Sequence, residues 1–188
     1  AVGRAALVKN EIDFAFARKE FCNILENARL DGTLPLRVTH NDTKLNNILF
    51  DANDGHAVAV VDLDTVMPGY SVNDFGDSIR YGCNAASEDE PDPSKVYFRF
   101  DLYEAFAKGY LESVKDIISL EERKSLPLGA LLMTYECGMR FLTDYLDGDV
   151  YFKTSREGHN LDRARTQFKL LEDMLDHYDD MESIILKY

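Results

Sequence analysis

Apolar side chains recur at helical spacing in several stretches of this chain. Residues 4–29 place one such stripe on a single side of a predicted helix (Ile12, Phe14, Phe16, Phe21, Ile24, Leu25 and Ala28). Similar spacing predicts helices over residues 97–111, 126–146 and 161–178, and a short helix is expected over 72–83. We interpret these stripes as core packing, because an amphipathic helix buries its apolar face against the rest of the domain.

Short apolar runs between the first helix and the later ones predict strands. These runs are residues 36–39, 48–50 and 57–61, and the Asn-Asp-Gly-His sequence of residues 53–56 favours a hairpin turn between the last two. The intervening segments are interpreted as a polar loop (41–47), a turn (68–69) and a solvated loop that is acidic and contains proline (86–94).

The order of these elements indicates the fold class. A helix comes first, then short strands that carry polar loops, then a run of helices. This order predicts one α+β domain over residues 1–188 that is mostly helical, with a small sheet at one edge. A length of 188 residues suits one domain with a sizeable core.

Composition narrows the function classes. The chain has a net charge of −13 and is 45% hydrophobic, an ordinary balance for a globular protein. An acidic chain repels phosphate backbones, so no nucleic-acid partner is expected, although ATP can bind where Mg²⁺ screens its charge. No apolar run approaches the roughly 20 residues of a membrane span. The cysteines are sparse and the first residues lack a signal-peptide pattern, so we expect reduced thiols and a cytoplasmic protein.

The residues that suggest chemistry lie in two short segments. Residues 40–47 read H-x-D-x-x-x-x-N. Two acidic residues, Asp62 and Asp64, come directly after the apolar run of residues 57–61. Kinases use such a set to hold Mg-ATP and to aim a hydroxyl at the γ-phosphate. Asp42 fits the carboxylate beside the attacking hydroxyl. The expected metal ligands are Asn47, Asp62 and Asp64, whose oxygens are the hard donors that Mg²⁺ prefers.

Two nearby residues have other expected roles. We expect His40 to hold the shape of the loop through hydrogen bonds rather than to transfer a proton. Asp74 begins an Asp-Phe-Gly sequence, which binds metal in protein kinases, but it follows a turn and not a strand. Asp62 lies 20 residues after Asp42, which suits a short hairpin between them, so the metal is assigned to Asp62. Asp74 is expected to brace the catalytic loop or to cap the next helix. The alternative for the whole set is that its Asp and Asn side chains make only local turns.

Residues 40–47 together with 61–64 resemble the aminoglycoside phosphotransferase and choline kinase superfamily, which has a protein-kinase-like fold. The sequences of residues 39–47 (THNDTKLNN) and 62–69 (DLDTVMPG) are similar to those of the N-acetylhexosamine 1-kinases. The same holds for residues 138–146 and 159–161. The resemblance implies the C-terminal lobe of that fold, with its catalytic and metal loops on a small β-hairpin sheet. It also implies ATP and Mg²⁺ as cofactors, and an N-acetylhexosamine phosphorylated at its anomeric hydroxyl.

The chain departs from that superfamily on the nucleotide side. Neither G-x-G-x-x-G nor G-x-x-x-x-G-K occurs in it. We therefore expect residues 1–188 to be the C-terminal catalytic lobe, without the N-terminal ATP-clamping lobe of the same polypeptide, and nearly inactive alone. The alternative is a catalytically incomplete fragment that binds nucleotide or sugar.

The acceptor site is predicted in the segment downstream of the catalytic loop. Arg140 offers a fork of donors for sugar hydroxyls, and Tyr151 offers a ring face and a hydroxyl. The structural alternatives are an ion pair with Glu136 for Arg140 and loop packing for Tyr151. An aminoglycoside, choline or another hydroxyl acceptor stays open, although the lack of tryptophan disfavours an aromatic cage for choline. His159 is expected to be structural.

Overall fold

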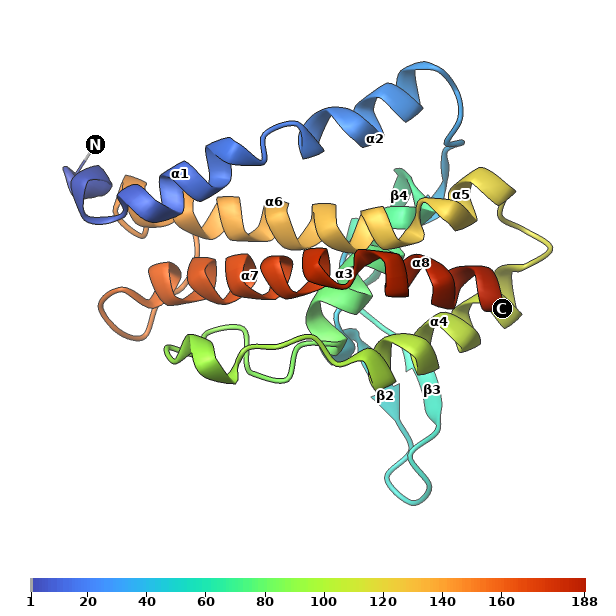
Figure 1. The fold of residues 1–188 in the computed structure, drawn as a ribbon. Helices are drawn as coiled ribbons and strands as arrows, with labels where there is room; N and C mark the ends of the chain where they lie inside the picture. The colour runs from blue at the N-terminus through green and yellow to red at the C-terminus, as the bar shows by residue number, and fades with distance from the viewer. Residues whose placement is uncertain (1) are drawn as a thin grey trace.

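A computed structural model describes residues 2–188 of the chain. Helix α6 (Leu126–Asp147) runs through its middle and packs on α3 (Ser71–Gly82) and α7 (His159–Asp176). The other α-helices are α1 (Lys9–Ala17), α2 (Phe21–Leu30), α4 (Phe100–Val114), α5 (Leu120–Lys124) and α8 (Tyr178–Lys187), and the strands are β1 (Arg37–Thr39), β2 (Ile48–Phe50), β3 (Ala57–Val60) and β4 (Met67–Gly69). Figure 1 shows α1 and α2 along one side of α6, α7 and α8 along another, and the β2–β3 hairpin projecting from the helices. The predicted fold class is confirmed, and the arrangement is consistent with the larger lobe of a kinase-like fold.

Part of the core lies where α3 crosses α6. A Cβ on Gly76 would lie 2.3 Å from the carbonyl oxygen of Gly129, and a Cβ on Gly129 would lie 2.2 Å from that of Val72. Both helices therefore need glycine for their backbones to approach. Phe75 is fully buried, with its ring edge-on to Tyr103 and the centroids 6.2 Å apart. The Phe and Gly of the Asp-Phe-Gly sequence thus serve helix packing.

Two antiparallel pairs of short strands carry the polar loops. The pair β2–β3 is the predicted hairpin, with Ile48 opposite Val60. Residues 68–69 belong to β4 rather than to the predicted turn, and Pro68 lies opposite Val38 of β1. Pairing with β1 overrides the turn preference of Pro-Gly. Proline is tolerated because each sheet has two strands, so every strand is an edge strand.

The first predicted helix is divided into a short 3₁₀ turn, α1 and α2. The break between α1 and α2, at residues 18–20, contains neither proline nor glycine. The Tyr135 hydroxyl donates to the carbonyl oxygen of Ala15 (2.7 Å), which also accepts from the Arg18 backbone N–H (3.1 Å). These bonds use the acceptor that the Lys19 N–H needs in a continuous helix. Contact with α6 therefore interrupts the helix where the local pattern predicts continuity.

The later helices follow the prediction with shifted ends. The helix over 126–146 is confirmed as α6, and that over 97–111 is α4, which begins and ends three residues later. The helix over 161–178 is α7, and α8 follows it without being predicted. Helix α5 is not predicted either. Its five residues are stabilised by a capping box between Ser119 and Glu122, and they have no apolar stripe that a periodic pattern would reveal. Within residues 2–188, no helix has both the length and the hydropathy to cross a bilayer.

The acidic segment 86–94 is attached to the domain at Glu88 and Asp89, whereas residues 91–94 are exposed, as expected of a solvated loop. Glu88 accepts from the Arg80 guanidinium (2.6 Å), and Asp89 lies 2.9 Å from Nε2 of His159. Arg80 and His159 are both buried. A buried basic group needs nearby acceptors, so these side chains hold the acidic segment against the helices.

Candidate active site

A carboxylate on α3 supports the loop between β1 and β2. The two oxygens of Asp74, in the first turn of α3, accept the backbone N–H groups of His40 (2.7 Å) and Asn41 (2.8 Å). Asn41 has a left-handed backbone (φ 63°), which an Asn side chain tolerates better than most. The structure therefore places Asp74 against the catalytic loop, with both oxygens engaged by it.

His40 joins this loop to the strand that precedes Asp62. Its Nε2 lies 2.9 Å from the carbonyl oxygen of Val61, and because a carbonyl only accepts, Nε2 carries the proton. The backbone oxygen of His40 accepts from the Thr65 hydroxyl (2.6 Å). These contacts are those of a positioning residue that connects the two halves of the site.

Asp42 presents its carboxylate at the centre of the loop. Its Oδ2 accepts from the Lys44 ammonium (2.7 Å) and the Asn47 amide (2.9 Å). Partial burial disfavours the charged form of Asp42, but these donors outweigh burial and hold the pKa of its carboxyl below the ordinary value. Asp42 is therefore ionised at neutral pH. Since these bonds use Oδ2, Oδ1 is the oxygen available to a substrate hydroxyl.

The hairpin brings Asn47 and Asp62 together. The Val61 N–H donates to the carbonyl oxygen of Asn47 (2.9 Å), which extends the β2–β3 ladder. Asp62 then leaves the strand with a left-handed backbone (φ 64°), a conformation that in non-glycine residues is often found at functional sites. The neighbouring carboxyl of Asp64 raises the pKa of Asp62, first because a hydrogen bond between the two carboxyls favours the protonated form and then because two negative charges repel each other.

The oxygen donors at the end of the hairpin suit Mg²⁺. Asp62 and Asp64 supply two neighbouring carboxylates. The amide nitrogen of Asn47 is the atom that donates to Asp42, so its amide oxygen is the atom that can serve as a ligand. In the described part of the chain, no three His, Cys, Asp or Glu side chains gather as a metal site. Mg²⁺ commonly takes one or two carboxylates from a protein and its other ligands from phosphates and water. The donor set therefore fits a magnesium ion that is shared with a nucleotide.

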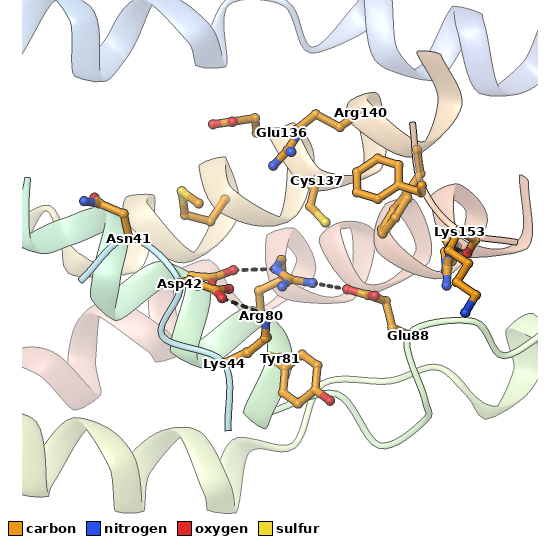
Figure 2. Close-up of a pocket in the computed structure, with 15 residues that line it drawn as sticks. Asn41, Asp42, Lys44, Arg80, Tyr81, Glu88, Glu136, Cys137, Arg140 and Lys153 are labelled. Atoms are coloured by element: carbon orange, nitrogen blue, oxygen red, sulfur yellow. Dashed lines mark hydrogen bonds and ion pairs between the residues drawn. The ribbon is translucent and has the colours of Figure 1, made fainter. Parts of the chain in front are cut away.

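A cavity of about 410 Å³ opens beside Asp42, within the range of small-molecule sites (Figure 2). The catalytic loop forms one side, with Asp42 labelled there, and α6 contributes Cys137 and Arg140. Arg80 of α3 crosses the floor, where Glu88 accepts from it. An acceptor molecule in this cavity can place a hydroxyl against the Asp42 carboxylate.

One of the two predicted acceptor residues lines this cavity. Arg140 does so, and its guanidinium lies 5.5 Å from the centre of the Phe152 ring and 5.9 Å from that of Tyr151. Among the residues drawn in Figure 2, no ion pair joins Arg140 to Glu136, so that structural alternative does not form. Tyr151 is 73% exposed and lines a more open hollow on the other side of Arg140.

The model of the phosphotransferase enzyme family, abbreviated APH, matches residues 4–113 of the chain. The chain belongs to this phosphotransferase family. The match includes the catalytic loop, the β2–β3 hairpin and α3, so the superfamily resemblance seen in the sequence is confirmed. It ends before α6, so the part of the cavity that contains Arg140 lies outside the matched residues.

Several residues of this candidate site were not predicted. Lys44 lies two residues after Asp42 within the motif, and that position was a usable signal. Arg80, Lys153 and Arg163 come from α3, a loop and α7, and no local pattern connects them. Only the packing of α3 and α7 against α6 brings them to one cavity.

The loop after α6 is organised by two buried polar side chains. Asp144 accepts the backbone N–H groups of Val150 (2.9 Å), Tyr151 (2.8 Å) and Phe152 (3.0 Å). Further along, His159 accepts the backbone N–H of residue 155 at Nδ1 (3.1 Å), so its proton lies on Nε2, which faces Asp89. The contacts of His159 are structural ones, and these hydrogen bonds anchor the loop that lines the cavity.

Proposed function

We propose that this chain is the catalytic lobe of an ATP- and Mg²⁺-dependent small-molecule kinase. The observation that carries this proposal is the position of Asp42, whose carboxylate belongs to the braced catalytic loop and also lines the cavity. Family membership supports phosphoryl transfer and leaves the acceptor to be inferred.

Asp42 and Lys44 act on the acceptor hydroxyl. Asp42 accepts a hydrogen bond from it, orients its oxygen toward the γ-phosphorus, and takes its proton as the new oxygen–phosphorus bond forms and the bond to ADP breaks. Lys44 lies 2.7 Å from the Asp42 carboxylate and favours its ionised form. A carboxylate that is charged and fixed before the acceptor arrives can orient the hydroxyl at once.

The metal is proposed to bind to Asn47, Asp62 and Asp64. When bound there, Mg²⁺ neutralises charge on the phosphate oxygens. His40 links the loop that contains Asn47 to the strand that ends at Asp62, so these ligands are positioned before nucleotide arrives.

Nucleotide clamping is proposed to come from an N-terminal lobe of the same polypeptide. Apolar side chains of the hairpin are about half exposed near Asp62, namely Leu49 (49%), Phe50 (48%), Val58 (55%) and Val60 (56%). An exposed apolar face of this kind fits contact with another lobe. The polypeptide in which both lobes are joined is called the intact kinase below.

Replacement of Asp62 is expected to affect metal binding more than replacement of Asp74. In the intact kinase, Asp62→Ala should abolish the Mg²⁺ dependence of ATP binding measured by calorimetry, because a carboxylate ligand is lost. Asp74→Ala should lower the melting temperature and keep the Mg²⁺ dependence, because Asp74 supports backbone N–H groups. Asp54→Ala, at the exposed far end of the same hairpin, is the control. Loss of Mg²⁺ dependence in Asp74→Ala alone would show that Asp74 holds the metal.

The proposed acceptor is an N-acetylhexosamine, phosphorylated at its anomeric hydroxyl. The resemblance of residues 138–146 and 159–161 to sugar 1-kinases supports this acceptor. The cavity also offers the paired rings of Phe141 and Phe152, whose centres are 4.7 Å apart, beside the Arg140 guanidinium. Sugars pack C–H faces on aromatic rings and accept hydrogen bonds from arginine at their hydroxyls.

Arg140→Ala is expected to raise the KM of the intact kinase for N-acetylhexosamine by about 10- to 100-fold, with the KM for ATP unchanged. A lost hydrogen bond from a charged donor costs about 1.5–3 kcal/mol, which sets that range. The control is Arg165→Ala, an exposed arginine of α7 that pairs with Glu11 outside the cavity.

An acceptor panel tests the substrate class. Steady-state kinetics should favour N-acetylglucosamine or N-acetylgalactosamine over choline and aminoglycosides. Preference for choline or an aminoglycoside by tenfold would refute the acceptor class, and an unchanged sugar KM in Arg140→Ala would return that residue to a structural role.

A further inference from the structure

Part of the charge in the cavity beside Asp42 is already neutralised. Lys44 lies 2.7 Å from the Asp42 carboxylate. Arg80 is held between Asp77 (2.8 Å) and Glu88 (2.6 Å). These two cations and three carboxylates carry a net charge of −1, so this part of the cavity does not itself attract an anion.

Three further basic side chains line the same cavity: Arg140, Lys153 and Arg163, named here the basic wall. Within residues 2–188, none of the three forms an ion pair, and the one unpaired carboxylate that lines the cavity with them is Glu136. The basic wall outweighs Glu136 and the paired groups, and the five cations and four carboxylates of the lining leave a net charge of +1. The chain as a whole has a net charge of −13, so this excess is a local property of the cavity.

The basic wall is built around one pair of aromatic rings. Phe141 and Phe152 lie 4.7 Å apart, with the Arg163 guanidinium 5.4 Å from the first ring and that of Arg140 5.5 Å from the second. Arg163 also donates to the backbone oxygen of Lys153 (3.2 Å), so the three residues adjoin one another. Aromatic rings stabilise guanidinium groups without cancelling their charge. The two guanidinium groups are thus stabilised with their charge available to a ligand, and Lys153 is joined to Arg163 through its backbone oxygen.

Polar groups without partners lie beside the basic wall. The Nε of Arg163 is buried and has no hydrogen-bond partner in the described chain. Gln167 lies one turn later on α7 and is 1% exposed. Its amide oxygen is also buried and has no hydrogen-bond partner in the described chain. Gln167 lines a second cavity of about 340 Å³ that adjoins the first through Arg163. Buried polar groups are normally satisfied, so these point to a polar ligand at this end of the site.

We propose that the acceptor carries an oxyanion, a carboxylate, sulfate or phosphate, that binds to the basic wall while its reacting hydroxyl lies against Asp42. This proposal rests on the proposed kinase function, because it assigns the reacting hydroxyl to Asp42. On a hexosamine whose anomeric oxygen attacks the γ-phosphorus, substituents at C4 and C6 lie farthest from the reaction. Figure 2 shows Lys153 across the cavity from Asp42, where such a substituent would reach. Arginine binds oxyanions through paired N–H donors, and the same charges disfavour cationic choline and aminoglycosides.

The test compares acceptors that differ only in charge. Calorimetry on the 188-residue chain would measure the binding of N-acetylglucosamine, its 6-sulfate and 6-phosphate, and the corresponding hexosaminuronic acid. At least one anionic sugar should bind tenfold or more tightly than the neutral sugar at low ionic strength, and added salt should reduce this preference. The sugar that wins identifies the oxyanion.

Variants of Lys153 test whether the basic wall causes the preference. Lys153→Gln should reduce the preference severalfold, and Lys153→Glu should reverse it. Lys115→Gln, an exposed lysine just after α4, should change nothing. If Lys153→Glu binds anionic sugars with the same preference as the unmodified chain, the proposal is overturned. It is also overturned if the Lys153 variants of the intact kinase lose affinity for MgATP and keep their affinity for anionic sugars.

The remaining outcomes separate this inference from the proposed function. Equal or tighter binding of the neutral sugar, or no binding of any sugar at millimolar concentration, overturns the basic wall as an anion site. If the intact kinase phosphorylates the neutral sugar with the highest kcat/KM, the kinase function stands and the anionic acceptor is refuted. If an anionic sugar binds with the expected preference but no hexosamine is phosphorylated, the anion site stands while the proposed kinase function, and the reacting position at Asp42 with it, fails.

Discussion

Asp42→Asn is expected to lower kcat of the intact kinase by about a hundredfold or more, with ATP binding largely retained. Asparagine has the size of aspartate and can accept from the amide of Asn47, as Asp42 does at 2.9 Å. It cannot take a proton from the acceptor hydroxyl, and general-base assistance of this kind contributes about 10²- to 10⁴-fold. The measurement is steady-state kinetics with saturating acceptor, together with calorimetry of MgATP binding.

The matched control is Asp116→Asn, the same change at an exposed position after α4. It should leave kcat within twofold of the unmodified enzyme. Near-normal turnover in Asp42→Asn would remove Asp42 from the chemistry. A large loss of MgATP affinity in the same variant would indicate that Asp42 acts on the nucleotide instead of the acceptor.

Glu122→Gln is expected to lower the free energy of unfolding by about 3 kcal/mol, because it leaves a mostly buried ion pair without its carboxylate. Glu122 is 1% exposed and accepts from the Arg37 guanidinium (2.7 and 3.0 Å), the Ser71 hydroxyl (2.9 Å) and the Ser119 N–H (2.8 Å). It thereby connects β1, α3 and α5, the elements on either side of the catalytic loop. Glutamine keeps the shape of the side chain, loses its charge, and turns an N–H₂ group toward donors.

Urea denaturation followed by circular dichroism measures this loss. Glu121→Gln is the control, since the neighbouring Glu121 is exposed and its contact with Lys124 is 3.5 Å long. Surface pairs of this kind contribute little, so the control should change stability by less than about 1 kcal/mol. Equal losses in the two variants would show that the Glu122 contacts do not hold the sheet to the helices.

The loss of unfolding free energy in Glu122→Gln is also expected to depend on pH. Burial alone would raise the pKa of Glu122, but its hydrogen bonds, with that from Arg37 the strongest, lower the pKa from an ordinary 4.5 to about 2. A carboxyl with a lowered folded-state pKa contributes stability above its unfolded pKa and loses it as pH falls through the folded value. The difference between the unmodified chain and Glu122→Gln should therefore be complete at pH 7 and shrink between pH 4.5 and about 2.

Some of the site follows from short-range sequence features. The catalytic loop and the β2–β3 hairpin occupy consecutive residues, so spacing alone predicts that Asn47 and Asp62 meet where the two strands pair. Helix α6 could be predicted because its apolar positions keep one period over many turns. The Asp-Phe-Gly sequence shows the limit of a short motif, because Gly76 packs α3 on α6 and Phe75 packs α3 on Tyr103 of α4.

The sequence by itself determined the fold class and the order of the candidate catalytic residues, because local periodicity and spacing act between near neighbours. Only the tertiary structure decided the features that depend on distant contacts. Tyr135 interrupts the first predicted helix, and β1 turns the Pro-Gly segment into a strand. In the same way, Arg140, Lys153 and Arg163 form a basic wall only because α6, α7 and the loop between them pack around one pair of aromatic rings. Contacts between residues that are far apart in the chain produce no pattern within a single short stretch of sequence, so local sequence features cannot predict them.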